Sequence, residues 1–194
     1  MANLLLFKIA QFLVTLGFVF FISDLRRKEG CEPLIDEKFV WAMKLSYLIP
    51  ITIYFYTLVT LGKILPIDFA ALLLTLLGAI MVIKAKIDLG NYHIWTGYKR
   101  EEIELVVKGI YRWMRHPMYL GIFIFIFGAI LTVIPHLNNK YLLIPFFLCL
   151  SYIIGFLTIA AKKETAFLEK KFGDRFSRYF EQIHPFFPLN KYED

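Results

Sequence analysis

The sequence predicts an all-α, polytopic integral membrane protein with five transmembrane helices in a single membrane domain. The first observation is composition, because 58% of the 194 residues are hydrophobic and the mean hydropathy is +0.59, which is too apolar for an ordinary soluble domain. The second is that apolar runs recur at close to the roughly 20 residues that a spanning helix needs. These runs lie at residues 3–22, 40–61, 66–83, 118–135 and 141–161.

The first span is interpreted as a retained membrane anchor. It lacks a small-residue cleavage site, and it is followed at once by Arg26, Arg27 and Lys28. A secretory signal peptide is therefore not expected.

Lysine and arginine gather in alternate connections between the spans. They are dense after the first, third and fifth spans, whereas the other two loops hold only Lys63 and Lys140. The positive-inside rule then predicts an N-terminus outside and a C-terminus in the cytoplasm. The net charge of +6 is explained by cationic loops that hold this orientation and touch anionic lipid headgroups. The partner is thus the lipid bilayer, and no nucleic acid partner is expected.

Residue types that bind metals or form disulfides are scattered. Cys31 and Cys149 have no partner spacing, and no His-x-x-x-His or Cys-x-x-Cys pair occurs. No Gly-rich phosphate loop and no Gly-x-Ser-x-Gly elbow are found. We therefore expect neither a metal site nor a disulfide, and the four histidines stand apart at His93, His116, His136 and His184.

The most informative stretch is residues 111–121, which reads Tyr-Arg-Trp-Met-Arg-His-Pro-Met-Tyr-Leu-Gly at the mouth of the fourth span. Pro117 suits the first turn of a helix, which puts Arg115 and His116 just before its N-terminus. Free backbone N–H groups and the positive end of the helix dipole could there receive a ligand carboxylate or hydroxyl. Tyr119 lies on the same face. We interpret this stretch as a binding site; the alternatives are a membrane anchor for Arg115 and an interfacial histidine for His116.

The segment after the fifth span, residues 162–183, has apolar positions at three- and four-residue intervals between charges. This pattern predicts an amphipathic helix on the membrane face. Glu164 stands beside Lys162 and Lys163 just beyond the hydrocarbon edge, where a carboxylate does nothing for insertion. It is therefore a candidate binding residue, with a structural ion pair as the alternative.

Two blocks of sequence also resemble a known family. The run from Arg115 to Gly121 resembles the Arg-His-Pro-x-Tyr-x-Gly signature of the isoprenylcysteine carboxyl methyltransferase family, whose relatives include phospholipid methyltransferases. The run from Glu164 to Gly173, with Tyr179 and Pro188 after it, resembles the Glu-x-x-x-Leu-x-x-x-Phe-Gly block of that family. The resemblance covers about residues 103–188, and the first 80 residues match only as hydrophobic spans.

The resemblance implies an enzyme that uses S-adenosyl-L-methionine and releases S-adenosyl-L-homocysteine. It implies a cytoplasmic cofactor pocket formed by the loop 84–117 and the C-terminal helix, in which residues 103–106 line the base and ribose and Glu164 helps to hold the cofactor. Ordinary packing is the alternative for this apolar wall. The expected cofactor-binding residues are Ile103, Glu104, Leu105, Val106, Tyr111, Arg115, His116, Pro117, Met118, Tyr119 and Glu164.

The resemblance further implies a lipophilic methyl acceptor, first of all the carboxylate of a prenylated cysteine. Because methyl transfer from a sulfonium needs alignment and exclusion of water, no catalytic general base is expected. Two positions depart from the family, since Ala160 stands where an arginine is associated with the acceptor carboxylate and Thr165 where a second glutamate is common. Lys162 and Lys163 are the candidate substrate-binding substitutes, although a lysine is a point charge rather than a fork. A phospholipid or another small lipid is the alternative acceptor.

Two other classes of function stay open. Sterol reductases end in a similar Arg-His-Pro-x-Tyr helix and bind NADPH, but their Gly-x-x-Trp pattern is absent, because Phe176 stands at the tryptophan position after Gly173. The non-enzymatic alternative is a small membrane scaffold whose cationic loops only bind lipid.

Overall fold

The computed structural model describes residues 2–23 and 30–192, so the basic cluster Arg26, Arg27 and Lys28 lies outside the described residues. The structure is 74% helical. Five of its helical segments are long and apolar enough to cross a membrane, which confirms the predicted all-α polytopic fold. They are Ala2–Ile22, Glu37–Thr60, Pro66–Tyr92, Pro117–His136 and Lys140–Phe172.

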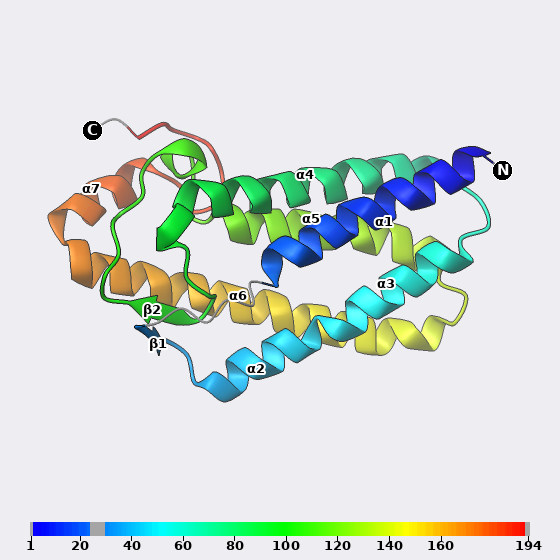
Figure 1. Cartoon of the computed structure of the whole chain (residues 1–194), viewed down its shortest axis with the longest axis horizontal. Helices are drawn as coiled ribbons and strands as arrows, with labels where there is room; N and C mark the ends of the chain where they lie inside the picture. The colour runs from blue at the N-terminus through cyan, green and yellow to red at the C-terminus, as the bar shows by residue number, and fades with distance from the viewer. Residues whose placement is uncertain (1, 24–29, 193–194) are drawn as a thin grey trace.

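The helices form an elongated bundle with different structures at its two ends (Figure 1). Helices α1, α4 and α5 form one half of the bundle, and α2, α3 and α6 form the other half. The N-terminus lies at one end, whereas α7, the two strands and the C-terminus lie at the other. The helices are α1 (Ala2–Ile22), α2 (Glu37–Ser46), α3 (Leu48–Thr60), α4 (Pro66–Leu89), α5 (Pro117–His136), α6 (Leu143–Phe172) and α7 (Asp174–Gln182).

Short elements connect these helices. Strands β1 (Cys31–Pro33) and β2 (Tyr98–Arg100) form an antiparallel ribbon in which Glu32 lies opposite Lys99. The sequence did not predict this ribbon, because three residues per strand leave no alternating pattern to detect. Three single turns of 3-10 helix complete the set: η1 (Gly90–Tyr92), η2 (Gly109–Arg112) and η3 (Lys140–Leu142).

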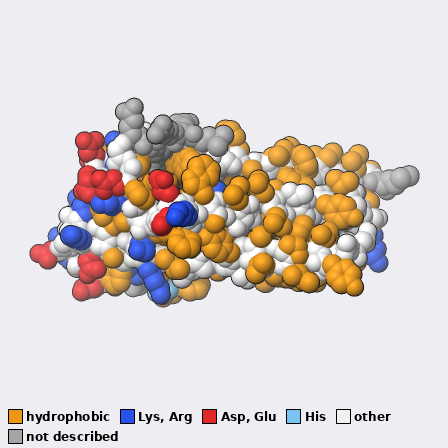
Figure 2. Space-filling model, turned by 90° about the horizontal axis from the view of Figure 1, so that it is seen from below, with side chains coloured by type: hydrophobic (Ala, Val, Ile, Leu, Met, Phe, Trp, Pro, Cys, Tyr) orange, Lys and Arg blue, Asp and Glu red, His pale blue; other side chains and the backbone are white. Residues whose placement is uncertain are grey.

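The surface divides into an apolar length and a charged end. Figure 2 shows charged side chains gathered toward the end that holds α7 and the strands, while hydrophobic side chains cover most of the remaining length of this face. Large apolar side chains are exposed on every spanning segment, as an apolar solvent requires. Examples are Leu13, Val59, Leu73, Phe127 and Leu148.

Glycines allow α4 and α5 to approach closely. A Cβ built on Gly121 would lie 2.9 Å from the carbonyl oxygen of Gly78, and one built on Gly128 would lie 2.9 Å from the carbonyl oxygen of Ala71. Glycines in apolar spans let helices approach closely, so the sequence predicts such contacts at Gly121 and Gly128 in the fourth span and at Gly155 in the fifth. The structure confirms this prediction at Gly121 and Gly128. The prediction is wrong at Gly155, where a Cβ would meet no atom of the described chain within 4 Å.

The second predicted span, 40–61, is two helices rather than one. Helix α2 ends at Ser46 and α3 begins at Leu48. Pro50 explains the break, because its ring crowds the carbonyl of Ser46 and it has no N–H to offer. Asp36 caps the start of α2 by accepting a hydrogen bond from the backbone N–H of Lys38 at 2.9 Å.

Two predicted helix ends are wrong for a shared reason. Helix α4 continues to Leu89 rather than stopping at residue 83, and α6 continues to Phe172 rather than giving way to a separate helix 162–183. In both cases hydrophobicity ends before the helix does. Each helix ends at a glycine with positive φ, Gly90 at 52° and Gly173 at 50°, a conformation that other residues avoid.

Candidate functional site

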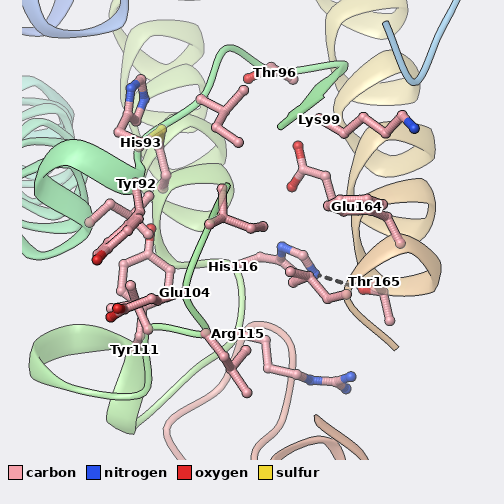
Figure 3. A pocket seen from close by; sticks show the side chains of 18 of the residues that line it. Tyr92, His93, Thr96, Lys99, Glu104, Tyr111, Arg115, His116, Glu164 and Thr165 are labelled. Carbon is pink, nitrogen blue, oxygen red and sulfur yellow. Dashed lines mark hydrogen bonds between the residues drawn. The ribbon is translucent and has the colours of Figure 1, made fainter. Parts of the chain in front are cut away.

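A pocket lies at the charged end of the bundle, and Figure 3 shows it from close by. Its walls come from the segment after α4, strand β2, the segment of residues 103–106, the loop into α5, one face of α6 and one face of α7. Ten of the eleven residues predicted to bind a cofactor line it, and the exception, Pro117, is buried at the start of α5. The ten are Ile103, Glu104, Leu105, Val106, Tyr111, Arg115, His116, Met118, Tyr119 and Glu164.

The two sequence blocks meet between α5 and α6. The phenol of Tyr119 donates a hydrogen bond to the carboxylate of Glu164. One residue further along α6, Thr165 lies with its hydroxyl oxygen 3.2 Å from Nε2 of His116. Glu164 reaches the pocket because α6 runs on beyond its apolar part, so that a polar turn of the helix faces the loop 84–117.

The imidazole of His116 contacts two aromatic rings. It stacks on the ring of Tyr119 with centroids 5.6 Å apart, and the tilted ring of Phe186 has its centroid 6.0 Å away. Burial, and secondly the positive charge of Arg115, lower the pKa of His116 to about 4. The side chain is thus neutral at pH 7, with one ring nitrogen as donor and the other as acceptor.

Arg115 also lines the pocket, and its guanidinium lies against an aromatic ring. Its guanidinium carbon lies 3.7 Å from the centroid of the Phe180 ring, a favourable cation–π distance. Its Nε is buried and has no hydrogen-bond partner within residues 2–23 and 30–192. A buried charged donor without a partner costs free energy, so this atom is suited to a ligand acceptor.

The C-terminal segment fastens the Arg-His-Pro signature. The backbone N–H of Arg115 donates to the carbonyl of His184 at 3.2 Å, and that of His116 donates to the carbonyl of Pro185 at 2.9 Å. These two N–H groups, just before the helix, are therefore occupied by backbone carbonyls and are not available to a ligand. About 70 residues separate the partners, so no local pattern could reveal the pairing.

Tyr179 holds the wall next to the signature. Its hydroxyl donates to the backbone carbonyl of Tyr111 at 2.6 Å, and burial raises the pKa of Tyr111 well above its usual range, so its phenol is neutral. Tyr179 also belongs to an apolar cluster that seats α7 against the loop. The amphipathic pattern after the fifth span thus serves packing against Leu105 and its neighbours, which are Phe176, Ile183 and Tyr192.

The two lysines predicted to bind substrate are not brought to the pocket. Lys162 and Lys163 are both exposed on α6, and the described lysine and arginine residues that line the pocket are Lys99 and Arg115. Sequence reasoning missed Lys99, whose ammonium lies 2.9 Å from the carboxylate of Glu32 and 3.5 Å from that of Glu101. The other lining residues it missed include Tyr92, His93, Thr96, Tyr98, Thr165, Phe167 and Tyr179.

Comparison with family models decides the family. The model described as Phospholipid methyltransferase matches residues 67–175, more than half of the chain. The chain belongs to the phospholipid methyltransferase family. This family includes the isoprenylcysteine carboxyl methyltransferases, so the resemblance predicted from the two blocks is confirmed. The comparison with curated proteins returned no match.

Family membership and fold together describe an integral membrane methyltransferase. The matched stretch begins at the start of α4 and ends just after Gly173. It therefore contains the α4–α5 glycine contact, the loop 84–117, the signature and Glu164. Most of helix α7, which lines the pocket through Phe176 and Tyr179, and the C-terminal segment lie beyond it.

Proposed function

We propose that the protein transfers a methyl group from S-adenosyl-L-methionine to a lipophilic acceptor. The observation that supports this most directly is that two blocks 45 residues apart converge on one pocket through Tyr119 and Glu164. Both blocks lie within the stretch that matches the methyltransferase family.

The residues of the pocket fit such a cofactor. The sulfonium supplies an activated methyl group when bound. The Glu164 carboxylate has lone pairs beyond the one that Tyr119 occupies, and these can accept from an ammonium or ribose hydroxyls. Ile103, Leu105 and Val106 offer an apolar wall to a flat base, and the unpartnered Nε of Arg115 can donate to a carboxylate.

The protein contribution is alignment and exclusion of water rather than proton transfer. His116 is neutral and stacked, which suits a hydrogen-bonding residue that orients a ligand. Removing water strengthens the attraction between charges in the pocket. We assign no catalytic general base.

The pocket is proposed to face the cytoplasm, with the N-terminus outside. It lies at the charged end of the bundle (Figure 2), and cationic segments are retained on the cytoplasmic side. Cys31, beside the pocket in β1, tests this orientation when Cys149 is replaced by serine. A membrane-impermeant maleimide should label inside-out vesicles and spare right-side-out vesicles, and the reverse pattern would invert the topology.

The acceptor predicted from the resemblance is a prenylcysteine carboxylate, and a lipid amine is the second candidate. Ala160, at the position of the family arginine, is fully buried and uncharged. Lys99 is paired with Glu32 and Glu101. The pocket also contains Glu104 and Glu164, so its charge favours an amine over a second carboxylate.

One experiment separates these alternatives. Detergent-purified protein is titrated calorimetrically with S-adenosyl-L-homocysteine and, in parallel, with NADPH. Saturable binding of S-adenosyl-L-homocysteine supports the proposal, whereas binding of NADPH alone would favour a reductase and binding of neither a scaffold. Methyl-labelled cofactor is then offered with a farnesylated cysteine or with phosphatidylethanolamine, because base releases label from a methyl ester and not from an N-methylamine.

A further inference from the structure

Helix α4 carries an acidic residue in its last turn, where the helix dipole disfavours negative charge. This residue, Asp88, makes specific contacts there. Its Oδ2 accepts a hydrogen bond from the backbone N–H of Ile110 at 2.7 Å, and its Oδ1 pairs with the ammonium of Lys84 one turn earlier on α4. The carboxylate therefore links the end of α4 to η2, 22 residues later in the chain.

The chain at η2 is shaped to receive this carboxylate. Gly109 has a φ of 62°, a conformation that favours glycine. A Cβ built on Gly109 would overlap the carboxylate of Asp88. The absence of a side chain at this position thus lets the Asp88 oxygens reach the N–H of the next residue.

A second contact, made by a different helix, holds the same turn. The hydroxyl of Tyr179 on α7 donates to the carbonyl of Tyr111 at 2.6 Å. Two side chains from different helices therefore bind the backbone of the consecutive residues Ile110 and Tyr111. Tyr111 lines the pocket, and Figure 3 shows it beside Glu104.

We propose that Asp88 is a positioning residue that sets the affinity of the pocket for its ligand by fixing the turn Gly109–Tyr111. Asp88 is not among the residues that line this pocket, so its effect passes through the backbone of Ile110. The ligand part of this inference rests on the proposed function, whereas the fixing of the turn does not.

The test uses the full-length protein in detergent and two measurements. Hydrogen–deuterium exchange of residues 105–116 reports the turn, and calorimetric titration with S-adenosyl-L-homocysteine reports the pocket. In Asp88→Ala we expect exchange of this segment to rise about tenfold or more, with α1 and α5 unchanged, and affinity to fall about tenfold, because one charge-assisted hydrogen bond is lost.

Two further variants separate positioning from loss of fold. Asp88→Asn keeps an oxygen that can accept from Ile110, so it should restore affinity to within about threefold of the wild type. Asp36→Ala removes a comparable carboxylate-to-N–H bond at the start of α2 and should leave both measurements of the pocket unchanged. Gly109→Ala should reproduce the Asp88→Ala phenotype, since its methyl group displaces the carboxylate.

Each outcome decides the inference. Unchanged exchange of residues 105–116 in Asp88→Ala would overturn it, and so would raised exchange with unchanged affinity or an Asn variant as weak as the Ala variant. If the wild type fails to bind S-adenosyl-L-homocysteine, the proposed function fails, and the exchange data alone then support or overturn the role of Asp88 in fixing the turn.

Discussion

Tyr119 of α5 donates a hydrogen bond to the carboxylate of Glu164 of α6, although 45 residues separate them in the chain. The same two helix turns also place His116 beside Thr165. The contact fixes the point where the two helices present polar groups to the pocket. A substitution at either residue is therefore expected to weaken ligand binding more than it destabilises the fold.

Glu164→Gln should weaken binding of S-adenosyl-L-homocysteine while leaving the protein folded. The amide keeps the size of the side chain but removes the negative charge, which costs about 1.5 to 3 kcal/mol for a charged hydrogen bond, or roughly 10- to 150-fold in affinity. Calorimetric titration of the purified variant measures this loss.

Glu169→Gln is the matched control for that experiment. Glu169 lies on the same helix, is exposed, and is not among the residues that line the pocket. Its substitution should leave the affinity within about twofold, because isolated surface charges contribute little. Equal affinities of the wild type, Glu164→Gln and Glu169→Gln would remove Glu164 from the binding site.

The depressed pKa of His116 predicts a specific pH dependence of stability. The pKa is about 4 in the folded protein and about 6.5 in an unfolded chain. Between these values the unfolded chain binds more protons, so the contribution is complete above pH 6.5 and is lost as pH falls toward 4. The loss is on the order of 3 kcal/mol. Denaturant unfolding in mixed micelles at several pH values measures it.

A variant without a titrating group isolates the effect. His116→Gln keeps a group able to bond with Thr165 and cannot take up a proton, so its stability should fall less steeply between pH 6.5 and 4. Parallel slopes for the variant and the wild type would show that His116 titrates normally in the folded protein.

Much of the fold follows from local properties of the chain. Apolar length alone identified the five spans, and the two glycines Gly121 and Gly128 revealed the close face of α5. Helix ends were predicted less well, because hydropathy falls at Lys84 and Lys162 whereas the backbone turns only at Gly90 and Gly173. Both helices continue with polar residues after their apolar part has ended.

The site was predictable only where it is local. The signature and Glu164 form recognisable blocks, and nearly all residues expected from them line the pocket. The residues that hold these blocks in place were missed. Asp88 binds Ile110, and His184 accepts from Arg115. The first contact joins a side chain to a distant backbone N–H, and the second joins two backbone groups. Neither kind of contact leaves a pattern in the local sequence.

The glycine contact between α4 and α5 predicts a sharp contrast between two alanine variants. Gly121→Ala would bring a methyl group to 2.9 Å from the Gly78 carbonyl and 3.0 Å from Met81 and Val82, and overpacking of this kind costs about 1 to 3 kcal/mol. Gly155→Ala meets no atom of the described chain within 4 Å and should stabilise α6 slightly through helix propensity. Unfolding in mixed micelles measures both, and equal effects would contradict the packing.

Asp68 and His136 contact each other at the end of the bundle remote from the pocket. The losses of stability caused by substituting them should therefore not be additive. Nε2 of His136 lies 2.9 Å from the Asp68 carboxylate, with the two side chains 7% and 0% exposed. Within the part of the chain that the structure describes, His136→Leu leaves that buried carboxylate with the backbone N–H of Leu65, at 2.6 Å, as its hydrogen-bond donor. The substitution should cost about 3 to 5 kcal/mol. Adding Asp68→Asn removes the stranded charge, so the double variant should be more stable than His136→Leu. A double variant whose loss equals the sum of the single losses would mean that the two groups do not interact.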